Sequence, residues 1–147
     1  FRDLVLYNLE AGQAVLTDNN DIRIYTDGKE KFHALIEEMK RAKKYIHVQY
    51  YIIRNDEVWQ DIEKVLIEKA HEGVEVRVLF DSMGCRTMHK RDWDRLKCEG
   101  IRVAEFFPAI LGQLQMRVNY RNHRKIVVID GKVGFVGGFN VGRDKYR

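Results

Sequence analysis

The chain has 147 residues and a formal net charge of +4, with 26 lysines and arginines against 22 acidic residues. This is the length of one domain, and no apolar run approaches the roughly 18 residues that span a bilayer. Cys85 and Cys98 lie far apart without metal-ligand spacing, which disfavours zinc and favours a reduced, cytoplasmic chain. The mild basic excess suits anionic partners, either lipid headgroups or nucleic acid.

The predicted elements alternate between strands and helices along most of the chain. Short extended pieces are expected at 1–7 and 14–17. Apolar periodicity and capping residues predict strands at 22–25, 45–53, 74–80 and 101–106, and helices that begin at Asp27, at Asn55 or Asp56, and over 86–97. The run at 45–53 is apolar on both faces, which predicts a central strand. The alternation indicates an α/β fold, and a hairpin near the C-terminus makes the sheet mixed.

Four segments allow a structural and a functional interpretation. The basic residues at 40–44 complement the end of a helix or form a lipid patch. His47, Gln49 and Tyr51 share one strand face, where they pack in the core or, for Gln49 and Tyr51, contact substrate. The loop at 81–84 follows the carboxyl end of a strand, where open α/β sheets place ligands. The apolar loop at 107–116 folds onto the core or receives acyl chains.

The hairpin is the strongest local prediction. Two β-branched or apolar runs, 126–129 and 133–136, flank Asp130-Gly131, which is typical of a two-residue type I′ turn. Such a turn sets Ile129 opposite Lys132. The same register then projects His123, Lys125 and Asn140 on one face, with Gly138 leaving space beside the imidazole.

An imidazole, an ammonium and a carboxamide around a hollow suit the binding and transfer of a phosphoryl group. His123 is otherwise explained as a packed strand histidine, Lys125 as an edge-strand charge, and 137–138 as a bulge. Asp130 lies on the opposite face from His123 in this register, which favours a structural role in the turn.

The joint spacing decides between these interpretations. His123-x-Lys125, Asp130 and Gly137-Gly138-x-Asn140 resemble the HxK(x)4D(x)6G(G/S)xN motif of the phospholipase D superfamily. Two segments, NHRKIVVIDG at 122–131 and VGGFNVG at 136–142, are most similar to the corresponding segments of bacterial cardiolipin synthases. Two further segments fit the same group: YTDG at 25–28 and YIHVQYYI at 45–52. The resemblance spans nearly the whole chain.

The resemblance implies a phospholipase D-like α-β-α sandwich over residues 1–147, as the first of two such halves in a longer protein. It implies phosphatidyl transfer, in which two phosphatidylglycerols give cardiolipin and glycerol through a phosphohistidine. His123, Lys125 and Asp130 take the catalytic positions, and Lys125, Asn140 and Gly138 bind the phosphate. Neither a metal nor another cofactor is implied, and the expected location is the membrane surface with a cytoplasmic catalytic domain.

Two departures from the family pattern shape the expected partners. Only one His-x-Lys motif is present, and the family's further acidic residue, which orients the histidine, would lie beyond Arg147. Family members also usually carry N-terminal membrane helices, so we expect a fragment whose partner is a second half in the same protein. The alternatives are a single-motif phosphodiesterase or nuclease that acts as a homodimer, and a silent domain that binds anionic lipid or nucleic acid. Nucleic acid is the less favoured partner.

Overall fold

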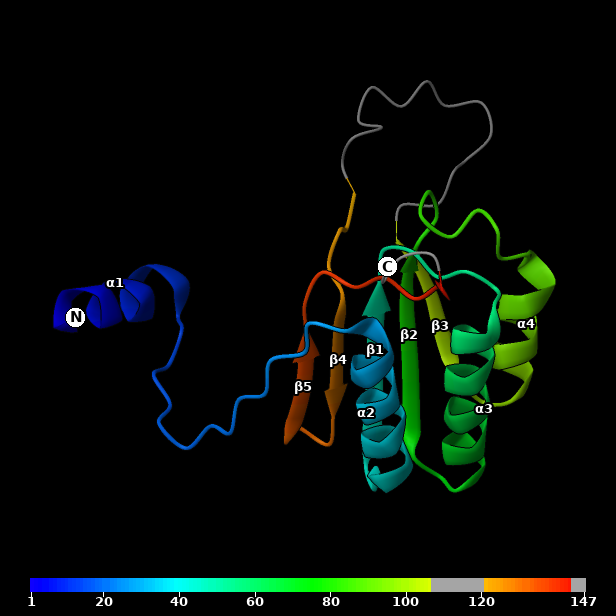
Figure 1. The fold of residues 1–147 in the computed structure, drawn as a ribbon, viewed down its shortest axis with the longest axis horizontal. Coiled ribbons are helices and arrows are strands. Elements are labelled where there is room, and N and C mark those ends of the chain that lie inside the picture. Colours follow the sequence, from blue (N-terminus) through cyan, green and yellow to red (C-terminus); the bar gives the residue numbers. More distant parts are fainter. Residues whose placement is uncertain (107–120, 144–147) are drawn as a thin grey trace.

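A five-stranded mixed sheet organises the structure, a computed structural model that describes residues 1–106 and 121–143. Its strands are β1 (Tyr45–Tyr50), β2 (Glu75–Asp81), β3 (Arg102–Phe106), β4 (Ile126–Ile129) and β5 (Val133–Val136). They lie in the order β3-β2-β1-β4-β5 (Figure 1). The first three strands are parallel, and the hairpin adds two antiparallel ones. The α/β class, the mixed sheet and the central position of β1 are therefore confirmed.

Helices α2 (Gly28–Arg41), α3 (Glu57–His71) and α4 (Lys90–Cys98) cover one face of this sheet (Figure 1). Alternate strand residues point into this layer because side chains of a strand alternate between its faces. Phe80 of β2, for example, stacks on Trp93 of α4 with ring centroids 3.9 Å apart. The largest fully buried core side chains are Trp59, Leu35, Met39, Ile46, Ile53, Ile62, Leu66, Leu96, Val78, Val127 and Val141. The core thus lies between the helices and one face of the sheet.

The helix boundaries follow from local capping groups that the sequence displays. Asp27 Oδ1 accepts hydrogen bonds from the N–H groups of Lys29 and Glu30 at 2.8 and 3.0 Å, as an N-cap does. Asp56 caps α3 in the same way. Helix α4 begins at Lys90, four residues later than predicted, because the chain after β2 first makes turns over 82–88.

The other face of the sheet carries no helix within residues 1–106 and 121–143. A hollow of about 480 Å³ lies there, over β1 to β4. Its lining includes the polar side chains of His47, Gln49, Arg77 and Arg102 and the apolar ones of Leu79, Ala104, Ile126 and Val128. The helical layer that the sandwich would place on this face therefore stays a prediction.

The N-terminal predictions were wrong. Residues predicted to be extended form helix α1 (Arg2–Gly12), in which no residue is buried. Leu, Glu and Ala favour a helix locally, and no strand is available there to pair with an extended chain. The strand predicted at 22–25 does not form either: Ile22 and Ile24 are 79% and 87% exposed. Alternation alone does not make a strand where no sheet edge receives its hydrogen bonds.

The hairpin strands have the predicted bounds, but their predicted register was wrong. Asp130 and Gly131 both have positive φ, 55° and 68°, and the Lys132 N–H donates to the Ile129 carbonyl at 3.0 Å, as in a type I′ turn. The ladder, however, pairs Ile129 with Val133, so that Lys132 is an extra residue. This one-residue shift moves Asn140 out of the face that the predicted register shared with His123.

Two further expectations concern a membrane-spanning segment and the apolar loop. No helix within the described parts of the chain is long and apolar enough to cross a membrane. The apolar loop at 107–116 lies outside the described residues, so neither of its interpretations is tested.

Candidate active site

His123 and Lys125 meet just before β4, at the end of the sheet where β1 finishes. The Lys125 Nζ lies 3.0 Å from Nδ1 and 3.1 Å from Nε2 of the His123 ring, and it donates a hydrogen bond to the His123 carbonyl at 2.7 Å. The Tyr51 ring lies against the imidazole, with centroids 4.6 Å apart, and the Lys125 Nζ is 5.5 Å from that ring's centroid. The predicted imidazole–ammonium pair is thus assembled.

Burial of Lys125 explains the position of its ammonium. Lys125 alternates with Val127 and Ile129, both buried beneath the helices, and it is itself only 6% exposed. Its aliphatic stem therefore packs with the core while its ammonium reaches the exposed imidazole. Burial lowers the pKa of Lys125 from its ordinary value, because a less hydrated ammonium is less stable.

Asn140 reaches the same end of the sheet by a route that the hairpin register did not predict. Its Oδ1 accepts a hydrogen bond from the Ile52 N–H at 3.3 Å, one residue beyond Tyr51. The Val141 N–H donates to the Ile52 carbonyl, and Val141 forms a parallel bridge with Ile53. The chain after β5 thus runs beside the chain after β1.

Gly138 has open space around it, since a Cβ added there would meet nothing within 4 Å. The predicted register set this space beside the imidazole, opposite His123, and the observed register does not. In the observed ladder, however, it is Gly137 that continues the pairing, through a hydrogen bond from its N–H to the Lys125 carbonyl.

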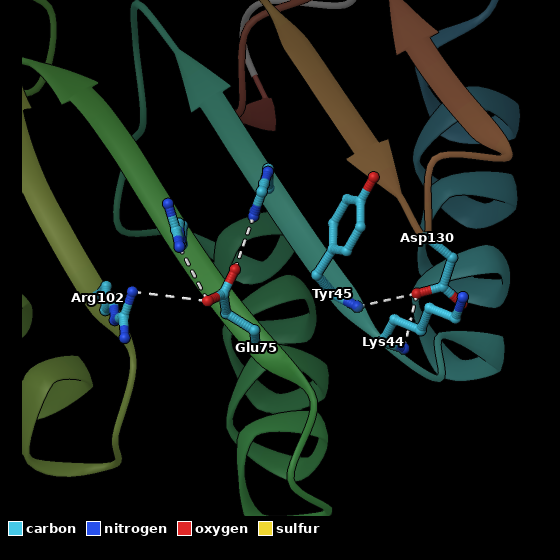
Figure 2. A network of polar contacts seen from close by, with 7 residues as sticks. Lys44, Tyr45, Glu75, Arg102 and Asp130 are labelled. Atoms are coloured by element: carbon cyan, nitrogen blue, oxygen red, sulfur yellow. Dashed lines mark hydrogen bonds and ion pairs between the residues drawn. The ribbon is translucent and has the colours of Figure 1, made fainter.

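Asp130 lies at the opposite end of β4 from the imidazole. Its carboxylate accepts a hydrogen bond from the Lys43 N–H at 2.8 Å. It also accepts hydrogen bonds from the N–H groups of Lys44 and Tyr45 at 2.8 and 2.9 Å (Figure 2). These bonds, led by that from Tyr45, lower its pKa. Strand rise puts Asp130 about 16 Å from Lys125 along the chain. The carboxylate therefore ties the hairpin turn to the start of β1, in keeping with the structural role that parity favoured.

A second polar cluster lies on the open face of the sheet. The Glu75 carboxylate contacts His47 at 3.1 Å, Arg77 at 2.9 Å and Arg102 at 3.5 Å (Figure 2). The hydrogen bonds from Arg77 and then from His47 lower the pKa of Glu75 to about 2. His47 and Gln49 thus line the open face rather than the core, whereas Tyr51 lies at the candidate site.

Sequence reasoning missed one residue that organises the site. Asp81, the last residue of β2, is 1% exposed, and its carboxylate accepts a hydrogen bond from the Asn122 N–H at 3.2 Å. The rule that ligands bind at the carboxyl ends of parallel strands pointed to this loop. It could not reveal the contact with Asn122, which lies 41 positions further along the chain.

The side chains assembled here are of the kinds that suit the binding and attack of a phosphoryl group. A solvent-exposed imidazole supplies a nucleophile or a proton, and an adjacent ammonium supplies charge for phosphoryl oxygens. Among the described residues, no three His, Cys, Asp or Glu side chains gather as metal ligands would.

A mixed sheet with this His-x-Lys pair before its antiparallel hairpin defines a phospholipase D-like domain. The chain belongs to the family described as "Cardiolipin synthase, PLD-like domain", whose model matches residues 35–147. Two solved structures share the fold, each at 19% sequence identity. NucT from Helicobacter pylori matches with a TM-score of 0.60 over 80% of this chain and 71% of its own. Nuc from Salmonella typhimurium, a phospholipase D family member, matches with a TM-score of 0.55 over 77% of this chain and 66% of its own.

Curated relatives match almost the whole chain. It is 48% identical to a cardiolipin synthase of Oceanobacillus iheyensis over 145 residues, which cover 99% of this chain and 30% of that protein. It is 46% identical to the major cardiolipin synthase ClsA of Bacillus subtilis, with the same coverage. A cardiolipin synthase of Staphylococcus aureus is 49% identical over 146 residues, which cover 99% of this chain and 29% of that protein. The chain thus spans less than a third of the length of these relatives.

Proposed function

We propose that this chain supplies one catalytic half of a phosphatidyltransferase that condenses two phosphatidylglycerols into cardiolipin and glycerol. The observation that carries the proposal is the Lys125 ammonium, 3.0 and 3.1 Å from the two ring nitrogens of His123. A phosphoryl group bonded to either nitrogen would hold its oxygens within reach of that ammonium. The names of the relatives support lipid as the substrate class.

The proposed reaction has two displacements at phosphorus. In the first, an imidazole nitrogen forms a P–N bond to one phosphatidylglycerol, the P–O bond to its glycerol headgroup breaks, and a second imidazole protonates the leaving oxygen. In the second, a headgroup hydroxyl of another phosphatidylglycerol attacks phosphorus and gives its proton to the second imidazole as the P–N bond breaks. His123 is one of these two imidazoles, as nucleophile or as acid.

The other motif residues have distinct proposed roles. Lys125 stabilises the negative charge that develops on the phosphoryl oxygens, and the Asn140 side-chain NH₂ group supplies further donors. Gly138 leaves room for the phosphate. Asp130 acts at a distance from phosphorus, by fixing the turn of the hairpin that presents His123.

The second imidazole must come from another part of the assembly. The chain carries one His-x-Lys motif, and its relatives are more than three times as long. We infer that a second phospholipase D-like half of the same protein supplies the partner histidine. A second copy of this chain is the alternative source. The substrate places the assembled site at an anionic membrane surface, and the net charge of +4 agrees with that location.

The test measures cardiolipin and glycerol made by the complete protein from phosphatidylglycerol vesicles. The two products should appear in equal amounts, and the His123→Ala variant should make neither. Hydrolysis of a nucleic acid without lipid transfer would support the nuclease alternative. Binding of vesicles without either reaction would support a silent binding domain.

The isolated chain tests the requirement for two histidines. We expect no cardiolipin from residues 1–147 alone, with molecular mass followed in parallel by light scattering. Synthesis by a monomer would contradict the two-histidine mechanism, whereas synthesis by a dimer would move the second imidazole to another copy.

A further inference from the structure

The carboxylate of Asp81 binds the chain segment that leads directly into His123. Its Oδ2 accepts the hydrogen bond from the Asn122 N–H, and its Oδ1 lies 3.7 Å from Nη1 of Arg121. Asp81 is the most buried charged residue in the described part of the chain, at 1% exposed. A buried carboxylate is costly unless it is paired and hydrogen-bonded, so these partners are held firmly in place.

The same carboxylate also shapes the loop after β2, which supports the site from a second side. Asp81 Oδ1 accepts hydrogen bonds from the N–H groups of Met83 and Gly84 at 2.9 and 3.4 Å. Gly84 lies very close to the chain after β1, since a Cβ added to it would lie 1.9 Å from the Tyr51 carbonyl oxygen. The Tyr51 ring in turn lies against the His123 ring.

Cys85 strengthens the contact between these two loops. Its Sγ accepts a hydrogen bond from the Ile53 N–H at 3.2 Å and lies 3.6 Å from the Tyr51 carbonyl oxygen. Burial raises the pKa of the Cys85 thiol to about 12, so it remains protonated and donates to that oxygen at neutral pH. The loop that Asp81 organises is therefore fastened to Tyr51 by backbone and side-chain contacts.

His123 itself is held between constrained neighbours. The Asn122 side chain accepts a hydrogen bond from the Arg124 N–H at 3.4 Å, closing a turn across His123. Asp81 holds the backbone of Asn122 at the start of that turn. Fixing one side of a tight turn fixes the direction of the side chain that projects from it.

We propose that Asp81 is a positioning residue for His123, which sets the imidazole against Lys125 and Tyr51 without touching the reacting atoms. The proposal rests on the proposed function only in that His123 is taken to react with phosphorus. The geometric claim, that Asp81 determines the placement of the imidazole, holds for any substrate.

The experiment compares two buried aspartates in the complete protein. Asp81→Asn keeps the shape of the side chain but replaces one acceptor oxygen by a donor, so it cannot satisfy both the loop and Asn122. Asp92→Asn is the matched control, because Asp92 is 8% exposed and accepts a hydrogen bond from the His89 N–H at the start of α4. Both variants lose a buried carboxylate, but only one lies beside the site.

Two readouts separate positioning from a purely structural role. The first is kcat against KM for phosphatidylglycerol vesicles. The second is the rate at which diethylpyrocarbonate modifies His123, measured by peptide mass spectrometry, with the exposed His33 and His71 as internal references. This second readout needs no enzymatic activity, so it tests the placement of His123 even if the complete protein transfers no lipid.

For Asp81→Asn we expect kcat to fall on the order of 100-fold with little change in KM, as for a misplacement of about 1 Å. His123 should be modified faster, because it loses its fixed contacts with Lys125 and Tyr51. Asp92→Asn should match the wild type in both measurements. An inactive wild type would refute the proposed function alone, and the modification rates would still decide the role of Asp81.

Three results would overturn the positioning role: wild-type kcat and reactivity in Asp81→Asn, a loss of kcat with unchanged reactivity of His123, or an equal loss in Asp92→Asn. If Asp81→Asn does not fold, an ester in place of the Asn122 amide removes only the N–H that Asp81 binds. Wild-type reactivity of His123 in that ester variant would also refute the proposal.

Discussion

Replacing Gly84 by alanine should damage both stability and catalysis, because the two atoms nearest to the new Cβ would be backbone atoms. An alanine Cβ would lie 1.9 Å from the Tyr51 oxygen and 2.7 Å from its carbonyl carbon. An ordinary carbon–oxygen contact is about 3.3 Å, so the two chains must separate by roughly 1.4 Å. No change of rotamer relieves a clash with backbone.

The magnitude follows from that displacement. Overpacking of this kind costs about 1–3 kcal/mol in the free energy of unfolding. Because the displaced residue is Tyr51, the ring that lies against His123 moves with it. A shift of about 1 Å at a catalytic group lowers the rate by around 100-fold.

Thermal unfolding and single-turnover phosphatidyl transfer in the complete protein measure the two effects. Gly134→Ala is the matched control, since a Cβ at that position in β5 meets nothing within 4 Å. It should leave the rate unchanged and the stability equal or slightly greater, because alanine restricts the unfolded chain more than glycine. A Gly84→Ala variant with wild-type melting temperature and rate would refute the reasoning.

Four further predictions concern the hairpin and the two site residues just before it. His123→Ala should abolish transfer with a nearly unchanged melting temperature, because the side chain is exposed; near-wild-type activity would remove His123 from the mechanism. Lys125→Ala should lower the rate by on the order of 3 kcal/mol in the activation barrier, as for a lost oxyanion donor. Burial lowers the pKa of Lys125 from 10.5, so activity should be present below the lowered pKa and lost as pH rises through it, with a midpoint under 10.5; a midpoint at or above 10.5 would contradict this assignment. Gly131→Val should lower the melting temperature, since φ is 68° there and a Cβ would lie 2.8 Å from the Tyr45 hydroxyl; an unchanged melting temperature would count against the strained turn.

Local signals in the sequence were sufficient for most of the elements. Asp27 and Asp56 cap their helices where predicted, and the strands on both sides of Asp130-Gly131 have the expected bounds. These features depend on contacts between residues two to four apart, which the sequence displays directly. The pairing of His123 with Lys125 belongs to the same class, because the two residues are separated by one position.

The N-terminal segment shows where such signals fail. The alternation of Ile22 and Ile24 matched a strand, but no neighbouring strand pairs with it in the described structure. The hairpin register failed for a related reason. A type I′ turn forms as expected, yet the ladder skips Lys132. The skip places Val133 and Phe135 of β5 against the core, where the predicted register would have placed Lys132 and Gly134.

The sequence by itself determined the class of the fold, the motif and its His123–Lys125 pair, because these depend on short-range spacing. Only the tertiary structure decided what surrounds that pair. The contacts of Asp81 with Asn122, of Tyr51 with His123 and of Asn140 with Ile52 each join segments more than 40 positions apart. Such contacts arise when parallel strands bring their carboxyl ends to one edge of the sheet, and no local pattern records which side chains will meet there.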